Sequence, residues 1–160
     1  MIVFTALIII LVNIAWWLFY SETENSFEGQ LSHRLSSLAH LGSALIKPEI
    51  VVSLSDGNLS AYDSTLDIIG SIRDADSLSE VFIIDPDYGY LATTLIEPDS
   101  VYYLAALNRI YVDSVFSQGW LASGDESDIL PLVTESYRVG DIYLKSAFAP
   151  LYDTAGAVAA

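Results

Sequence analysis

The sequence contains no cysteine, and only six of its 160 residues are lysine or arginine. Without cysteine the chain forms no disulfide and offers no thiol nucleophile or thiolate metal ligand. The six basic residues stand against 21 acidic ones, which gives a formal net charge of −15 at pH 7. A surface with this charge repels phosphate groups, so the composition argues against nucleic acid as a partner.

Charged residues are scarce as a class, at 17%, whereas 52% of the residues are hydrophobic. These proportions exclude a disordered or collagen-like chain, and the apolar share is high for a purely soluble domain. The length allows one domain of about 100 to 150 residues and one appendage. We therefore expect a single small domain with a lipid-facing segment.

The apolar residues are concentrated at the N-terminus, where residues 2–20 contain no charged side chain. As a helix this segment extends about 28 Å, close to the hydrocarbon thickness of a bilayer. Trp16, Trp17 and Tyr20 lie at its end, where aromatic rings favour the headgroup region. A cleaved signal peptide has a basic n-region and a small-x-small cleavage site, and neither precedes Ser21. The sequence thus predicts an uncleaved transmembrane signal anchor over residues 1–20.

The charged side chains all follow residue 20, where a globular pattern begins. We therefore expect the anchor to lie in the cell (inner) membrane and the remaining chain to be extracytoplasmic, on the periplasmic side. The absence of cysteine is compatible with this location.

A long stalk helix is expected to follow the anchor over residues 21–47. Ser21 and Glu24 have the S-x-x-E form of a capping box. An apolar stripe then recurs at spacings of 4, 3, 4 and 3, at Leu31, Leu35, Leu38, Gly42 and Leu45. Two interpretations remain open: the stripe packs on the domain's own sheet, or it also packs on a second copy to form a homodimer. Pro48 ends or restarts the helix, and residues 48–160 form the domain.

Within the domain, helical and strand patterns alternate. A core-facing helix is predicted over about 60–73, and Pro98 and Asp99 precede a third helix that ends at about 117, with Leu104 among its apolar residues. Two β-rich runs, 80–85 and 90–94, flank a Pro/Asp/Gly turn and predict a hairpin or a meander. A loop with Trp120 follows the third helix. Three final strands are expected over 130–137, 141–152 and from 157 onward, which indicates an α/β (α+β) fold.

The segments "VFIIDPDYGYLATT" and "YRVGDIYLKSAFAPLYDTAGAVAA" resemble the extracytoplasmic Cache (PAS-like) sensor domain of bacterial signalling receptors, with sensor histidine kinases as the best match. The signature A-x-A-P-L/I-x-D-x-x-G falls at Ala147, Ala149, Pro150, Leu151, Asp153 and Gly156. The resemblance covers nearly the whole chain, although the motif mostly encodes a strand, a turn and a strand. It implies a central antiparallel sheet with flanking helices. Such receptors continue into a second span and a cytoplasmic transmitter, which we expect beyond Ala160, and these residues contain no kinase motif.

No arrangement of residues indicates catalysis or a cofactor. Asp85-x-Asp87-x-Gly89 begins like a calcium loop, but its twelfth position is Ile96 where a bidentate glutamate is needed, so turn chemistry is the better interpretation. His33 and His40 are about 10.5 Å apart along a helix axis, too far to share a metal ion. Motifs of serine hydrolases, zinc proteases and phosphate-binding loops are absent.

A ligand pocket has more support, on one face of the predicted strand 141–152. Alternation places Tyr143, Lys145, Ala147 and Ala149 on that face, and Ile142, Leu144, Ser146 and Phe148 on a core face. The first face combines an aromatic ring, a rare cation and two small residues, which suits an anionic or carbonyl ligand. The alternative is a surface lysine paired with a neighbouring acid. Further contributions are expected from Tyr137, Arg138, Arg109 and Tyr111, with Trp120 as a lid or a core anchor.

The predicted function is sensing of a small, anionic molecule outside the membrane. By the resemblance, ligand binding shifts the sheet and the stalk helix, and a homodimer passes the change through the membrane to a two-component transmitter. Two other classes of protein share part of this pattern. A pilin-like structural subunit needs a basic leader and an early acidic residue in its apolar helix, which are missing here. An anchored extracytoplasmic enzyme needs a polar catalytic constellation.

Overall fold

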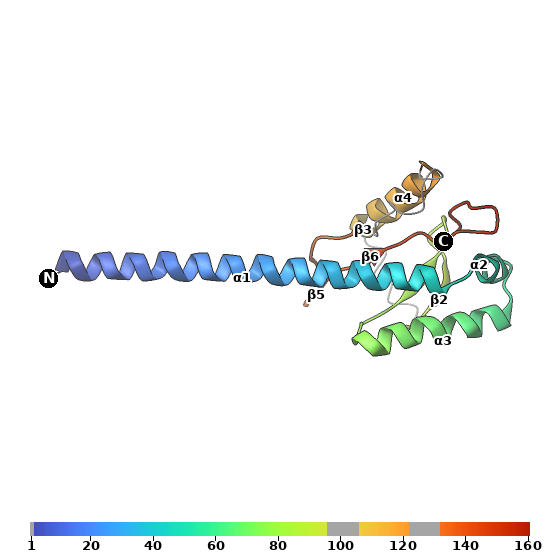
Figure 1. Ribbon diagram of the computed structural model, residues 1–160, viewed down its shortest axis with the longest axis horizontal. Coiled ribbons are helices and arrows are strands. Elements are labelled where there is room, and N and C mark those ends of the chain that lie inside the picture. Colours follow the sequence, from blue (N-terminus) through green and yellow to red (C-terminus); the bar gives the residue numbers. More distant parts are fainter. Residues whose placement is uncertain (1, 96–105, 122–131) are drawn as a thin grey trace. The chain divides into compact units, whose positions relative to one another are not determined.

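The computed structural model describes residues 2–95, 106–121 and 132–160. The chain divides into two compact units, Met1–Arg34 and Leu35–Ala160. Its elements are helices and short antiparallel strands, with one long apolar helix at the N-terminus (Figure 1). The mixed α/β class predicted from the sequence is therefore confirmed.

Helix α1 is continuous over Ile2–Leu45. Within the described ranges it is the one helix that is long and apolar enough to cross a membrane, by length and composition alone. The predicted capping box at Ser21 is wrong because the preceding residues are already helical, so the amides there have carbonyl partners four residues back. The Thr23 hydroxyl donates instead to the Phe19 carbonyl at 2.8 Å.

Two shorter helices follow, α2 (Pro48–Ser55) and α3 (Leu59–Asp76). Pro48 is the first residue of α2, a position where the missing N–H leaves no helical hydrogen bond unmade, so the predicted restart is confirmed. Asn58 caps α3, and its side-chain oxygen accepts from the amides of Ser60 and Ala61 at 2.9 and 3.2 Å. Helix α3 contains the predicted segment 60–73 and extends it at both ends.

The predicted hairpin is present as strands β1 (Phe82–Ile84) and β2 (Tyr90–Thr93). Ile83 pairs with Ala92, but Ile84 pairs with Tyr90, so Leu91 is an extra residue that forms a bulge. The bulge reverses the alternation of side chains along β2. As a result Ile83 and Ala92 face one core cluster, whereas Ile84 and Tyr90 pack in another.

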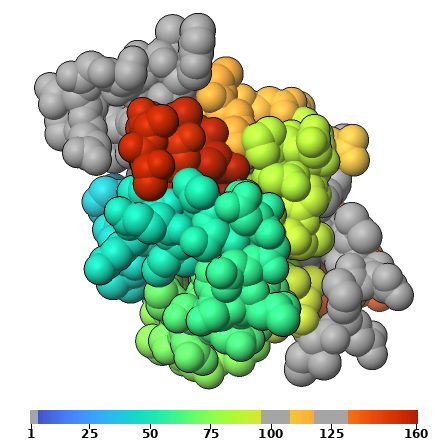
Figure 2. Space-filling model, turned by 90° about the vertical axis from the view of Figure 1, so that its right-hand side faces the viewer, coloured from blue at the N-terminus to red at the C-terminus, as the bar shows by residue number. Residues whose placement is uncertain are grey.

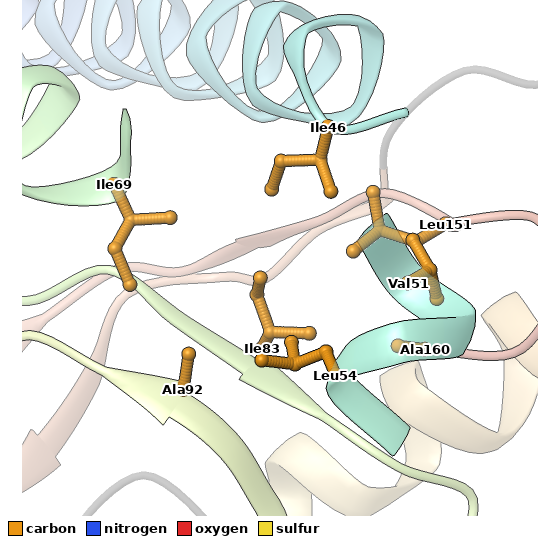
Figure 3. Close-up of a cluster of buried hydrophobic side chains, with 8 residues drawn as sticks. All are labelled: Ile46, Val51, Leu54, Ile69, Ile83, Ala92, Leu151 and Ala160. Atoms are coloured by element: carbon orange, nitrogen blue, oxygen red, sulfur yellow. The ribbon is translucent and has the colours of Figure 1, made fainter. Parts of the chain in front are cut away.

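The first core cluster joins the hairpin to α2, α3 and the C-terminal segment. Figure 3 shows its buried side chains, Ile46, Val51, Leu54, Ile69, Ile83, Ala92, Leu151 and Ala160. The C-terminal segment turns back on itself, with the Leu151 amide donating to the Ala160 carbonyl at 2.7 Å. In Figure 2 this segment, in red, lies against the teal surface of α2.

The end of the A-x-A-P-L-x-D-x-x-G signature forms the turn of this segment. Asp153 Oδ1 accepts from the amides of Ala155 and Ala157 at 2.8 and 2.9 Å. Gly156 adopts φ +80°, which favours glycine. The turn predicted over 153–156 is confirmed, and it returns Ala160 to Leu151, so that both lie in the core.

The second core cluster involves helix α4 (Ala106–Leu121), strand β3 (Leu132–Val133) and strand β6 (Ala147–Phe148). Val112 and Val115 of α4 meet Ile84 and Phe148. The predicted beginning of this helix, with Pro98, Asp99 and Leu104, lies outside the described residues. Its end was predicted too early: α4 continues through Gly119, which costs about 1 kcal/mol within a helix, so Trp120 is helical.

The predicted strand 141–152 is wrong as one element. Strand β5 (Ile142–Leu144) pairs with β4 (Tyr137–Val139), whereas β6 pairs with β3, and the chain between β5 and β6 changes partner at Lys145 and Ser146. Ser146 bonds to Thr134, through its carbonyl at 2.9 Å and its amide at 3.0 Å. The described strands form three two-stranded antiparallel pairs, and the predicted central sheet is not seen among them.

Candidate functional site

The hairpin β4–β5 presents Arg138 and Tyr143 on one exposed face. These residues are cross-strand partners, and the Arg138 guanidinium lies 5.9 Å from the centroid of the Tyr143 ring. Gly140, at φ +60°, allows the two-residue turn that sets this register. Arg138 also donates to the Gly140 carbonyl at 2.7 Å and to Asp141 at 3.0 Å. Two predicted ligand residues are therefore adjacent, and both are exposed.

Strand β5 is open to solvent within the described part of the chain. The Tyr143 side chain is 73% exposed, and its neighbour Ile142 is 64% exposed. The prediction that Ile142 faces the core is wrong, because β5 pairs only with β4 and nothing else is described over its second face. The exposed arginine and ring together offer a charged donor beside an aromatic surface, which suits a small anion.

Tyr137 belongs to a different environment from Arg138, because adjacent residues of a strand point to opposite faces. Its hydroxyl accepts from Asn108 Nδ2 of α4 at 3.2 Å and shares a hydrogen bond with Ser146 Oγ at 2.7 Å. Asn108 and Thr134 are fully buried, and Thr134 in turn bonds Ser146. This polar cluster connects α4 to the segment between β5 and β6.

The other predicted residues are distributed over the unit. Lys145 is half-buried at the break between β5 and β6, so it does not share a strand face with Ala147. Tyr111 packs beside the second core cluster. Trp120 lies in the last turn of α4, and its side chain is outside the described part. Ligand binding by these residues stays a prediction.

Arg109 does not join the hairpin residues but stacks on Tyr88, in the turn between β1 and β2. Its guanidinium lies 4.9 Å from the ring centroid, and the Tyr88 hydroxyl donates to Asp113 one turn further along α4. This hydrogen bond to a carboxylate raises the pKa of Tyr88 above its usual value. Tyr88 has φ +64°, a sparsely populated conformation for a residue with a side chain. The turn is thus attached to α4 by one aromatic residue.

The turn itself has the chemistry predicted for Asp85. Asp85 Oδ1 accepts from the amides of Asp87 and Gly89 at 2.9 and 2.7 Å. A Cβ at position 89 would lie 2.7 Å from Asp85 Oδ2, so glycine permits this close approach. No group of three or more histidine, aspartate or glutamate side chains suited to a metal ion occurs in the described ranges.

Glu80 is a titratable group that the sequence did not single out. It precedes β1, and Thr93 Oγ1 donates to its Oε1 at 2.8 Å. Its Oε2 is buried and has no hydrogen-bond partner in the part of the chain described. Desolvation raises the Glu80 pKa from 4.5 to about 7, against the smaller lowering effect of the Thr93 hydrogen bond.

The sequence contained partial signals for these missed residues. Asp113 follows the predicted site residue Arg109 by four positions on a predicted helix, and Glu80 is a charge directly before an apolar strand. Their partners Tyr88 and Thr93 depend on tertiary packing, so a one-dimensional pattern does not identify them.

The chain was compared with known protein families, curated proteins and solved structures. No family model, curated protein or solved structure matches the chain. Chemically, the described geometry places an exposed guanidinium, already paired with Asp141, beside an aromatic ring, and it leaves one buried oxygen on Glu80 that can take a proton.

Proposed function

We propose that this chain is a membrane-anchored, extracytoplasmic sensory module that binds a small anionic molecule and belongs to a homodimeric two-component receptor. The observation on which this rests is the continuity of α1. One helix contains the apolar residues 2–20, of membrane-spanning length, and ends next to Ile46, which is buried in the folded unit Leu35–Ala160.

The packing at the end of α1 supports a role for this helix in communication. A Cβ placed on Gly42 would lie 3.5 Å from Ile72 Cδ1 of α3, so the last turns of α1 contact α3 closely. Ile46 contributes to the same cluster as Ile83 and Leu151. A change in this cluster therefore has a direct mechanical route to the helix, as a sensor requires.

The packing of hairpin β1–β2 supports a single sensory unit, although the described strands do not form the central sheet of a PAS-like domain. Hairpin β1–β2 packs with α2 and α3 through one core cluster and with α4 through the other. The Arg138–Tyr143 face supplies the anionic preference, because it places a guanidinium beside an aromatic ring in a protein with few cations. Signalling needs no catalysis by this unit, only different ligand affinity in two conformations.

The test is a thermal-shift screen of the full chain in detergent micelles against short mono- and dicarboxylates and amino acids. A hit is then titrated by calorimetry against Arg138→Ala, Tyr143→Ala and Lys145→Ala. One charge-assisted hydrogen bond contributes about 1.5 to 3 kcal/mol to binding, so affinity should fall roughly tenfold to a hundredfold in Arg138→Ala or in Lys145→Ala.

Lys47→Ala is the matched control, since Lys47 is an exposed lysine on the connection between α1 and α2. Its affinity should equal that of the wild type. A panel without a hit, or a hit unaffected by all three variants, would overturn the proposed ligand site. Turnover of any hit would favour the anchored enzyme instead.

A further inference from the structure

The open end of hairpin β1–β2 contains a small polar network around Glu80 and Thr93. Thr93 Oγ1 donates to Glu80 Oε1 at 2.8 Å and accepts from the Leu95 amide at 3.1 Å. One hydroxyl thus connects a carboxyl group to the backbone at the point where the chain leaves β2. The Leu95 amide can only donate, so only the direction of the bond between Thr93 and Glu80 depends on the protonation of Glu80.

A second set of bonds holds the same end of the hairpin in place. The Val81 amide donates to Thr94 Oγ1, and the Thr94 amide donates to the Val81 carbonyl, both at 3.0 Å. Arg73 of α3 donates to the Thr94 carbonyl at 3.3 Å. The backbone next to Glu80 is therefore fixed to Thr94, and Thr94 is bonded in turn to α3.

Within the described residues, α3 places a charged group in contact with this end of the hairpin, through Arg73. Arg73 forms an ion pair with Asp74 at 2.7 Å, and Asp76 lies in the last turn of the same helix. Strand β2, Tyr90–Thr93, has no charged residue. Glu80 forms no ion pair with any described residue, and its buried Oε2 has no donor there. Ionisation of Glu80 is consequently opposed by desolvation and supported mainly by one hydroxyl.

We infer that Glu80 is a proton-binding site whose occupancy is transmitted through Thr93 to the backbone at Leu95. As a carboxylate, Glu80 only accepts, so Thr93 must donate to it and keeps its lone pairs for the Leu95 amide. As a neutral acid, Glu80 no longer polarises the Thr93 O–H bond and can itself donate to Thr93 Oγ1, and either change makes that oxygen a poorer acceptor for the Leu95 amide. Proton binding therefore weakens the tether at Leu95. The raised Glu80 pKa, about 7, places this change near neutral pH.

This device is independent of the proposed anion site, because Glu80 and Arg138 belong to different hairpins. With this proton-binding site, the unit would respond to pH as well as to an anionic ligand.

The test is a pH titration of the full chain in detergent micelles, with glutamate labelled by carbon-13 at the carboxyl carbon. The signal missing in Glu80→Gln identifies Glu80, and its midpoint is expected near 7 in the wild type. Hydrogen exchange of the Leu95 amide, corrected for intrinsic pH dependence, should slow several-fold as the pH rises through this midpoint. In Glu80→Gln that transition should disappear.

Thr93→Val separates the relay from simple burial. It removes the only described hydrogen bond to Glu80, so the Glu80 midpoint should move to higher pH, while Leu95 exchange becomes fast at every pH. Glu49→Gln, at an exposed position in α2, should change neither measurement. A Glu80 midpoint near 4.5, or Leu95 exchange that has the same pH profile in wild type and Glu80→Gln, would overturn the inference.

Discussion

The Tyr137 hydroxyl holds three parts of the fold together. It bonds Asn108 of α4 and Ser146, which in turn bonds Thr134. Tyr137→Phe keeps the ring but removes one partner from two polar side chains in this cluster, so the free energy of unfolding should fall by about 1 to 3 kcal/mol. Urea denaturation of the full chain measures this. Tyr143→Phe, at an exposed ring, should change the value by less than about 0.5 kcal/mol. Equal effects would contradict a structural role for the Tyr137 hydroxyl.

Glu80 makes stability depend on pH in a direction opposite to most carboxylates. Because burial raises its pKa in the folded state, its favourable contribution is complete below 4.5 and is lost as the pH rises through about 7. The full shift corresponds to roughly 3 kcal/mol, and since the residue is only half-buried, solvent screening reduces this to about 1 to 2 kcal/mol. The loss of stability between pH 5 and pH 8 should therefore be smaller in Glu80→Gln than in the wild type by that amount. If the free energy of unfolding has the same pH dependence in the wild type and in Glu80→Gln, this prediction is contradicted.

The helices were more predictable than the strands because helical periodicity is local. Helix α3 and the restart at Pro48 follow from apolar spacing and a proline. The division of 141–152 into β5 and β6 depends on a change of pairing partner, which the alternating pattern does not record. The reversed faces of β2 were not predicted for the same reason, because the alternating pattern does not record the bulge at Leu91. Among site residues, the Arg138–Tyr143 pair followed from a short hairpin, whereas the contact of Arg109 with Tyr88 joins residues 21 positions apart.

Helix α1 combines covered and uncovered apolar residues in its last turns. Gly42 faces Ile72, whereas Leu41 and Leu45 are about half exposed. Leu38, Leu41 and Leu45 are spaced by three and four residues, as in the seam between paired helices. If the chain forms the proposed homodimer through this helix, single cysteines at 38, 41 and 45 should crosslink strongly in the membrane. A cysteine at Gly42 should crosslink weakly, because that position contacts its own α3.

The crosslinking pattern shows whether the face formed by Leu38, Leu41 and Leu45 packs on a second copy. Strong and weak positions that alternate with this period support packing on a second copy. Uniformly weak crosslinking along residues 35–45 would mean that the helix packs only within its own chain. The cysteine-free sequence makes the scan possible without background substitutions.

A net charge of −15 on 160 residues affects the chain as a whole. Repulsion between carboxylates destabilises the compact unit. Salt weakens this repulsion, because the screening length falls from about 30 Å at 0.01 M to about 3 Å at 1 M. Asp63 and Asp67 give a defined example: both are exposed, and they lie four residues apart on α3. Like charges at this spacing oppose each other on a helix surface.

Asp67→Lys converts this repulsive pair into an attractive one, with the acid N-terminal to the base. The free energy of unfolding should rise by about 0.5 to 1 kcal/mol in 0.01 M salt, with Asp67→Asn giving about half of that gain. Both gains should largely disappear in 1 M sodium chloride, because exposed charges are then screened. Urea denaturation of the three proteins at both salt concentrations measures the effect. A gain that persists unchanged at 1 M would show that position 67 acts through helix propensity, and not through the repulsion between carboxylates.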